Sequence, residues 1–242
     1  MDLGIEGRTA VVTGGSRGIG AAVAARLEQE GARVIAVSRG DGIDVTERGA
    51  AEAIAERAGG PVDILVNNAG TARIAPLDEL TEEDFTAAFT LNVIAPLRLM
   101  GRFAPEMAER GWGRIVNVTS TAGKRPSQTY PAYSVAKAAQ HSLSRAAADF
   151  WAPRGVLVNV VAPGPTGTGL WRDPGGLAEQ LAERSGGTAE EALAGQAAKV
   201  PLGRMGEPGE VADVIAFLCS ERASWVAGVA WSVDGGVWQS ML

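Results

Sequence analysis

Short runs of apolar residues alternate along this chain with longer stretches in which alanine and charged residues are mixed. The apolar runs predict buried β-strands at residues 9–13, 33–38, 63–66, 114–118, 156–161 and 229–233. The longer stretches predict helices at residues 18–29, 47–57, 81–110, 131–151 and 208–220. Strands that alternate with helices and are apolar on both faces are typical of a parallel sheet covered on both sides. We therefore expect one α/β domain that spans residues 1–242.

The connection after the second predicted strand is unusually short. Only residues 40–43 separate Arg39 at the end of that strand from Asp44. A parallel crossover normally takes a dozen or more residues, and four extended residues reach only about 13 Å. We therefore predict that the crossover helix after the second strand is missing or vestigial, and that the next strand is absent or a stub near residues 43–45.

Two other stretches depart from the simple alternation. Pro96 and Pro105 lie inside the long helical stretch, and we expect them to bend or break it. Residues 165–200 are rich in glycine, alanine and glutamate and show weak periodicity. We expect this segment to form a substrate lid within the same domain rather than a second domain.

Composition limits the classes of protein to which the chain can belong. Its 22 basic and 28 acidic residues give a net charge of −6, and no basic cluster suits a phosphate backbone. The single cysteine, Cys219, lies in an apolar run and cannot form an internal disulfide. No apolar run reaches the roughly 18 residues of a membrane span, and the N-terminus lacks a signal-peptide pattern. We therefore expect a cytoplasmic protein without a nucleic-acid or membrane partner.

A glycine-rich turn follows the first predicted strand, with Gly14, Gly18 and Gly20 in a G-x-x-x-G-x-G pattern. Glycines let the backbone turn sharply and approach a pyrophosphate, and the N-terminus of the next helix offers free N–H groups to the anion. A tight turn that binds nothing is the alternative. The position between first strand and first helix favours a dinucleotide site in a doubly wound, Rossmann-type sheet. Its predicted contacts are Gly14, Ser16, Arg17, Gly18, Ile19 and Gly20.

The end of the second strand bears on the choice of dinucleotide. An acidic residue at this position binds the ribose 2′-hydroxyl of NAD, whereas arginine suits the 2′-phosphate of NADP. The chain has Ser38 and Arg39 there, and Arg17 in the glycine-rich turn can supply a second guanidinium. Asp41 is the competing signal. We therefore favour NADP(H) over NAD(H) as the cofactor.

Tyr133 and Lys137 lie four residues apart in the helix predicted at residues 131–151, so their side chains share one face. A free tyrosine has a pKa of about 10, and a nearby ammonium lowers that pKa. Such a phenol can donate a proton to a carbonyl oxygen or accept one from an alcohol. An exposed helix pair without a role is the alternative. Together with the nucleotide turn, the pair points to hydride transfer on a carbonyl or an alcohol.

In the order and spacing of these motifs, the chain resembles the classical short-chain dehydrogenases/reductases, and among them the 3-oxoacyl-carrier-protein reductases. The matching positions cover nearly the whole chain: residues 13–20, 44–46, 67–70, 92–93, Ser120, Tyr133, Lys137, 163–164, Thr168 and 233–236. Ser120 precedes Tyr133 by thirteen residues, a spacing that the family often shows. The missing crossover helix departs from the usual pattern on the adenine side.

The resemblance implies roles for individual residues. Tyr133 would act as general acid or base, and Lys137 would hold the nicotinamide ribose. Ser120 would hydrogen-bond the substrate oxygen, and Asn92 would anchor a water that links Lys137 to solvent. For Asn92 the alternative is a polar residue that satisfies a bent helix. The other cofactor contacts that the resemblance implies are Asp44, Val45, Asn68, Ala69, Gly70, Pro163, Gly164, Thr166 and Thr168.

We therefore predict an NADP(H)-dependent oxidoreductase, a carbonyl reductase that interconverts a ketone or aldehyde with an alcohol. An NAD-dependent alcohol dehydrogenase of the same fold and a dinucleotide-binding protein without turnover are the alternatives. Family members are commonly tetramers, so the resemblance implies a homotetramer or homodimer. Trp171 in the predicted lid is a candidate substrate contact, and no metal ion is expected. His141, one turn after Lys137, is expected to pack or to satisfy polar contacts, and the sequence does not identify the substrate.

Overall fold

Six parallel strands form the central sheet of the computed structural model, which describes residues 2–239. Their bounds are β1 Thr9–Thr13, β2 Arg33–Val37, β3 Ile64–Asn67, β4 Gly113–Val118, β5 Val156–Pro163 and β6 Ala230–Val233. The order across the sheet is β2-β1-β3-β4-β5-β6, so the chain moves outward from β1 to β2 and then returns to the other side of β1. This reversal between β1 and β3 opens a crevice at the carboxyl ends of the strands.

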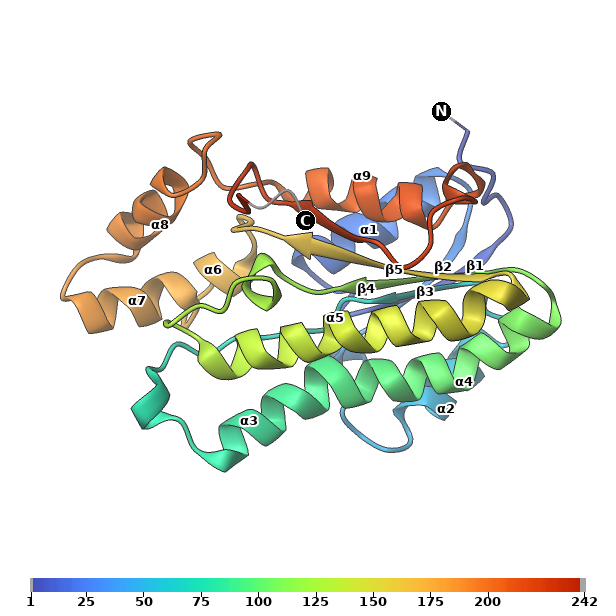
Figure 1. Cartoon of the computed structure of the whole chain (residues 1–242), viewed down its shortest axis with the longest axis horizontal. Helices are drawn as coiled ribbons and strands as arrows, with labels where there is room; N and C mark the ends of the chain where they lie inside the picture. The colour runs from blue at the N-terminus through green and yellow to red at the C-terminus, as the bar shows by residue number, and fades with distance from the viewer. Residues whose placement is uncertain (1, 240–242) are drawn as a thin grey trace.

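Helices cover both faces of this sheet (Figure 1). The helices on one face are α1 Gly18–Gln29 and α9 Pro208–Leu218, and those on the other are α2 Ala50–Ala58, α4 Ala95–Glu109 and α5 Pro131–Trp151. Leu27 and Ile215 are fully buried in the first layer, and Ile54 and Phe103 are buried in the second. The predicted doubly wound architecture is therefore confirmed.

The short connection after β2 is also confirmed. The chain makes a single 3₁₀ turn, η1 Arg39–Asp41, and within the described residues no strand forms at positions 43–45. Ile43 and Val45 are instead buried in the core beside α2. The crossover to β3 is made by α2 alone, which leaves β2 at the edge of the sheet.

The long helical stretch divides into three parts. They are α3 Glu82–Phe89, the π-helical segment η3 Thr90–Ile94, and α4. The interruption lies directly before Pro96, because proline lacks the N–H that would bond to the carbonyl of Asn92 in an α-helix. Pro105 lies inside α4, so the helix does not break there.

Residues 165–200 form three short helices beyond the carboxyl ends of the strands, at the left of Figure 1. They are α6 Gly169–Arg172, α7 Leu177–Ser185 and α8 Ala189–Ala198. A separate apolar cluster of Ile74, Trp171, Leu177 and Ala178 holds them against the rest of the domain. In residues 2–239, no helix is both long enough and apolar enough to cross a membrane.

The start of α1 packs against the chain around it with no room for a side chain. A Cβ atom on Gly20 would lie 2.2 Å from the carbonyl oxygen of Gly14 and 2.4 Å from Nδ2 of Asn68. Gly101 inside α4 is the opposite case, because nothing lies within 4 Å of the position of its Cβ. Alanine substitutions at these two helical glycines therefore separate two effects on the free energy of unfolding. One is the clash of an added Cβ, and the other is the backbone entropy of glycine.

We expect Gly20→Ala to lower the free energy of unfolding by about 1–3 kcal/mol through overpacking. Gly101→Ala should raise it by about 0.4–1 kcal/mol, because alanine loses less backbone entropy in a helix. Urea unfolding followed by circular dichroism measures both changes. Equal effects of the two substitutions would show that the turn before α1 is not packed as described.

Candidate active site

A cleft of about 940 Å³ lies at the carboxyl ends of the strands. The loops that follow β1, β2, β3, β4 and β5 all line it, together with α5 and residues from the segment 165–200. Parallel α/β sheets bind ligands at this place, outside the point where the strand order reverses. The structure thus brings all the predicted cofactor regions to one cleft.

The glycine-rich turn is fastened to the loop after β3. The hydroxyl of Thr13 accepts from the N–H groups of Asn68 at 3.0 Å and Ala69 at 3.1 Å, and Nδ2 of Asn68 donates to the Thr13 carbonyl at 2.9 Å. Gly14 and Gly18 have φ values of 64° and 56°, which favour glycine. No side chain caps the start of α1, so its N–H groups remain available to an anion.

The loop after β2 carries both Arg39, which favours NADP(H), and Asp41, which favours NAD(H). The Ser38 hydroxyl donates to Asp41 at 2.6 Å. Arg39 lines the cleft and, among the described residues, forms no ion pair. The carboxylate of Asp44 accepts from the N–H and hydroxyl of Thr46 at 2.9 and 2.7 Å, which lowers the pKa of Asp44. Arg39, which is expected to bind the 2′-phosphate, therefore shares this loop with the acidic residue Asp41.

Arg17 has a partner that its place in the sequence does not indicate. Its guanidinium lies 2.7 Å from the carboxylate of Asp173, and both side chains are largely exposed. Asp173 directly follows α6, in the segment 165–200. This ion pair joins the glycine-rich turn to that segment across the rim of the cleft. Thr168 also lies against the turn, because a Cβ on Gly18 would be 3.2 Å from its side chain.

Helix α5 carries the phenol and the ammonium into the cleft. Nζ of Lys137 lies 5.5 Å from the centre of the Tyr133 ring, and both residues line the cleft together with Ser120. The Ser120 side chain also accepts from the N–H of Ala122 at 3.1 Å. Three of the four predicted catalytic residues thus come together here from two segments of the chain.

Burial is the main cause of the pKa shifts of Tyr133 and Lys137. It raises the pKa of Tyr133 above its usual value, and a hydrogen bond with Ser120 acts in the opposite sense. Burial also lowers the pKa of Lys137 from 10.5 to about 7. This differs from the expectation that the ammonium lowers the Tyr133 pKa. The ammonium is directed elsewhere, to the Val118 carbonyl at 2.8 Å and to Oε1 of Gln140 at 2.9 Å.

Asn92, the fourth predicted residue, lies in the π-helical segment and is 1% exposed. Its Nδ2 donates to the Ala88 carbonyl at 2.8 Å, while its Oδ1 is buried without a partner in the described residues. A Cβ on Gly70 would lie 3.5 Å from this oxygen and 3.7 Å from Nζ of Lys137. Buried polar atoms rarely lack a partner, so this oxygen marks a place where a polar group is expected.

Gln140 is a residue that the sequence reasoning missed. Gln140 is 1% exposed. The Ser144 hydroxyl donates to the backbone carbonyl of Gln140 at 2.6 Å and accepts from Nδ2 of Asn117 at 2.8 Å. A glutamine three residues after Lys137 on the same helix was the available signal. His141 behaves as expected, since its Nε2 lies 3.1 Å from the Thr119 hydroxyl and burial lowers its pKa.

Trp171 reaches the cleft from α6. Its side chain is 6% exposed, packs in the apolar cluster with Leu177, and lines the cleft. Tyr130 packs against the same cluster and meets the Tyr133 ring edge-on, with centroids 5.8 Å apart. The predicted substrate contact thus lies on the apolar side of the cleft. Pro163, Gly164 and Thr166 line the cleft after β5, as the sequence indicated.

This chain matches the family model described as enoyl-(acyl carrier protein) reductase over residues 14–238. It is 34% identical to an L-2,3-butanediol dehydrogenase of Corynebacterium glutamicum over 95% of this chain and 98% of the relative. It is 35% identical to the 3-oxoacyl-[acyl-carrier-protein] reductase MabA of Mycobacterium avium, over 95% of this chain and 89% of the relative. The structure of an L-sorbose reductase from Gluconobacter frateurii, complexed with NADPH and L-sorbose, aligns with a TM-score of 0.90, 32% identity and complete coverage of both chains.

The chain therefore belongs to the short-chain dehydrogenase/reductase family. It is an oxidoreductase that acts on CH–OH or carbonyl groups with NAD(P), as the resemblance of its motifs indicated.

The contact between Lys137 and Gln140 generates a prediction. Gln140→Leu removes one of two acceptors that stabilise the ammonium, so the Lys137 pKa should fall by about one unit below its value near 7. Gln140→Glu places a carboxylate there and should raise that pKa. The ammonium would then be lost at lower pH in the first variant and at higher pH in the second.

The chain has only three lysines, so ¹³Cε shifts of lysine-labelled protein resolve this titration directly. Lys124→Arg and Lys199→Arg assign the other two signals. If both Gln140 variants titrate like the wild type, Gln140 does not hold the ammonium.

Proposed function

We propose that this chain is an NADP(H)-dependent reductase that interconverts a ketone or aldehyde with an alcohol. The observation that carries the proposal is the meeting of Ser120, Tyr133 and Lys137 with the buried Asn92 beside a glycine-rich turn. These groups combine an anion-binding helix start with a phenol and an ammonium. This combination suits hydride transfer to a carbonyl.

Tyr133 is the proposed proton donor in the direction of reduction. When bound, a nicotinamide supplies the hydride that attacks the carbonyl carbon. The Tyr133 hydroxyl gives its proton to the carbonyl oxygen, while the Ser120 hydroxyl donates a hydrogen bond to the same oxygen as negative charge develops. In the direction of oxidation, the Tyr133 phenolate accepts the proton of the alcohol. Overall, a ketone or aldehyde, NADPH and a proton are converted to an alcohol and NADP⁺.

Lys137 and Asn92 are proposed to return the proton to Tyr133. The Lys137 ammonium, 5.5 Å from the Tyr133 ring, is proposed to favour the phenolate left after proton transfer, against burial, which raises the Tyr133 pKa. Oδ1 of Asn92, which has no partner in the described residues, offers a hydrogen-bond acceptor near Gly70, where the Lys137 ammonium also lies. A water anchored by Asn92 would complete the route to solvent. A binding protein without turnover would not need these four side chains together.

Arg39, with Ser38 and Arg17, is proposed to bind the 2′-phosphate of NADP(H). Arg39 has no carboxylate partner in the described residues, which supports this role. The L-sorbose reductase that this chain resembles was solved with NADPH. Asp41 supports the alternative, an NAD-dependent alcohol dehydrogenase, because it already accepts from Ser38. The remaining predicted contacts of the cofactor line the same cleft and keep their proposed roles: Asp44, Val45, Asn68, Ala69, Gly70, Pro163, Gly164, Thr166 and Thr168.

The segment 165–200 is proposed to act as a lid over the substrate, with Trp171 in contact with it. A homotetramer or homodimer is the proposed assembly. Val135 and Phe150 on α5, together with Trp231 on β6, are apolar side chains exposed in the single chain, which supports that assembly. The cytoplasmic location stays a prediction from the sequence.

Tyr133→Phe should lower kcat at least about 100-fold, because no other group donates the proton, while the affinity for NADPH changes little. Steady-state assays measure kcat, and titration of tryptophan fluorescence with NADPH measures the affinity for the cofactor. Turnover near the wild-type rate would remove Tyr133 from the mechanism.

Arg39→Ala should weaken NADPH binding about 10- to 100-fold, since a hydrogen-bonded charge pair contributes about 1.5–3 kcal/mol. NADH binding should change by less than about twofold. Arg33→Ala at the amino end of β2 is the matched control, because that arginine is exposed and lies outside the cleft. Equal losses for the two cofactors in Arg39→Ala would refute the role of Arg39 at the 2′-phosphate.

A further inference from the structure

We propose that the carbonyl substrate of this site carries an anionic group, such as a carboxylate, and that Arg125 and Lys199 bind it at the mouth of the cleft. The inference rests on the proposed function, because it assigns the substrate class of the same site. Both residues line the cleft, and both side chains are exposed at its rim. Neither belongs to the motifs that the sequence singled out.

The charges that line the cleft have the opposite sign to the charge of the chain. The basic side chains are Arg17, Arg39, Arg125, Lys137 and Lys199, and the acidic ones are Asp41 and Asp44. The chain as a whole has a net charge of −6. A cleft with an excess of positive charge in an acidic protein attracts anions and raises their local concentration. The cofactor phosphates account for part of this excess.

The other cations of the cleft already have partners or proposed roles. Arg17 pairs with Asp173, and Lys137 donates to two oxygens. Arg39 lies after β2, where both carboxylates also lie. Within residues 2–239, Arg125 and Lys199 form no ion pair. Among the described residues that line the cleft, two unpaired cations therefore remain, and both come from segments other than the loop after β2 that carries the two carboxylates.

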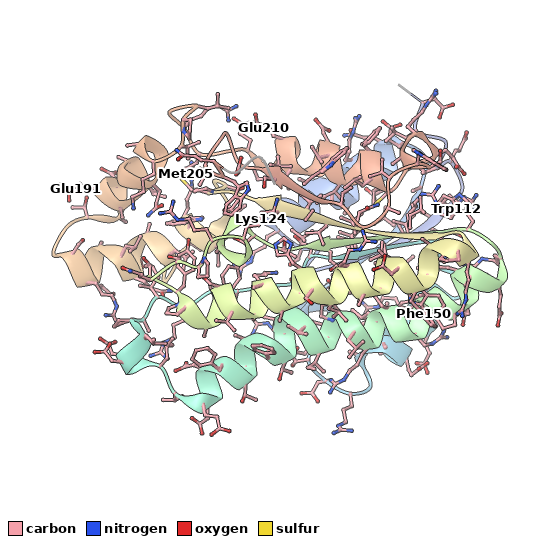
Figure 2. All side chains as sticks on the ribbon, in the orientation of Figure 1. Trp112, Lys124, Phe150, Glu191, Met205 and Glu210 are labelled. Carbon is pink, nitrogen blue, oxygen red and sulfur yellow. The ribbon has the colours of Figure 1, made fainter. Side chains whose placement is uncertain are left out.

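Both cations lie on the substrate side of the catalytic group. Arg125 is in the loop between Ser120 and Tyr133, and Lys199 directly follows α8. The neighbouring Lys124, labelled in Figure 2, marks this loop. Lys124 is held in the fold, because its ammonium donates to the Ala230 carbonyl at 2.6 Å and to the Ser232 hydroxyl at 2.9 Å. The adjacent Arg125 guanidinium forms no hydrogen bond or ion pair with any residue that the structure describes.

Apolar side chains line the cleft between the catalytic group and this rim. Tyr130, Trp171 and Leu177 line the cleft and share one apolar cluster, and Trp238 lines it from the C-terminal segment. A substrate that fits has its carbonyl group at Tyr133, an apolar body against these side chains, and its anionic end at the rim. A guanidinium binds a carboxylate with two parallel hydrogen bonds, which would orient such a substrate.

The test compares 2-, 3-, 4- and 5-oxo acids with their methyl esters, at saturating NADPH. We expect at least one acid to have a kcat/KM about tenfold or more above that of its ester. Arg125→Gln and Lys199→Gln should each lower this acid-to-ester ratio several-fold, mainly through the KM of the acid. Arg33→Gln removes an exposed charge outside the cleft and should leave the ratio unchanged. Where the acids or the esters are reduced, the proposal is overturned if no acid exceeds its ester, or if neither cleft variant changes the ratio.

Failure of the proposed function gives a different result. If neither acids nor esters are reduced while NADPH still binds, the activity is wrong, and the anion site is tested by binding alone. Saturated carboxylates from butanoate to hexanoate are then compared with their amides by quenching of tryptophan fluorescence in the NADPH complex. Tighter binding of the carboxylates that Arg125→Gln weakens supports the site. Equal binding of acids and amides overturns it.

Discussion

The parallel pairing of β1 with β2 on one side and β3 on the other is the constraint on which the rest of this structure depends. Because the chain leaves β1 in one direction and returns on the other side, the loops after β1 and β3 cannot close over each other, and a crevice stays open between them. The Thr13 hydroxyl fastens these two loops together at its base. Ser120 reaches this crevice from the chain after β4, and Tyr133 and Lys137 reach it from α5.

Burial sets the chemistry that this crevice can perform. Lys137 is 2% exposed, and its buried ammonium is stabilised because the Val118 carbonyl and Oε1 of Gln140 accept hydrogen bonds from it. Buried polar residues continue from Gln140, because the Ser144 hydroxyl donates to its backbone carbonyl and accepts from Asn117. An amine whose pKa is about 7 can gain and lose a proton under physiological conditions. The buried polar chain below α5 is therefore as much a part of the site as the residues that face the cleft.

The sequence predicted the features that depend on local pattern. The bounds of β1, α1 and α5 agree with the apolar runs and helix signals, because glycine or proline fixes where each helix begins or ends. The absence of a separate crossover helix and strand between β2 and α2 followed from chain length alone. The family motifs predicted residues that the fold brings to one cleft, except Asn92 and Gly20, which do not line it; the roles of these residues stay predictions.

What the sequence could not show depends on contacts between distant residues. Arg17 and Asp173 are 156 residues apart, and no local signal connects them. Gln140 was passed over because its importance depends on burial beside Lys137, and the effect of burial on Tyr133 outweighed the expected effect of the ammonium. Arg125 and Lys199 acquire significance only because the fold brings both, from distant parts of the chain, to the lining of one cleft.

The most direct test of the central claim follows the hydride itself. NADPH that carries deuterium at C4 of the nicotinamide, in separate samples for each face, would be incubated with the wild-type protein and a panel of ketones and aldehydes. Mass spectrometry of the products locates the label. The account predicts an alcohol with one deuterium on the carbinol carbon, from one of the two labelled faces only. Consumption of NADPH without deuterium in any alcohol, or binding of NADPH with no alcohol formed from any compound of the panel, would contradict it.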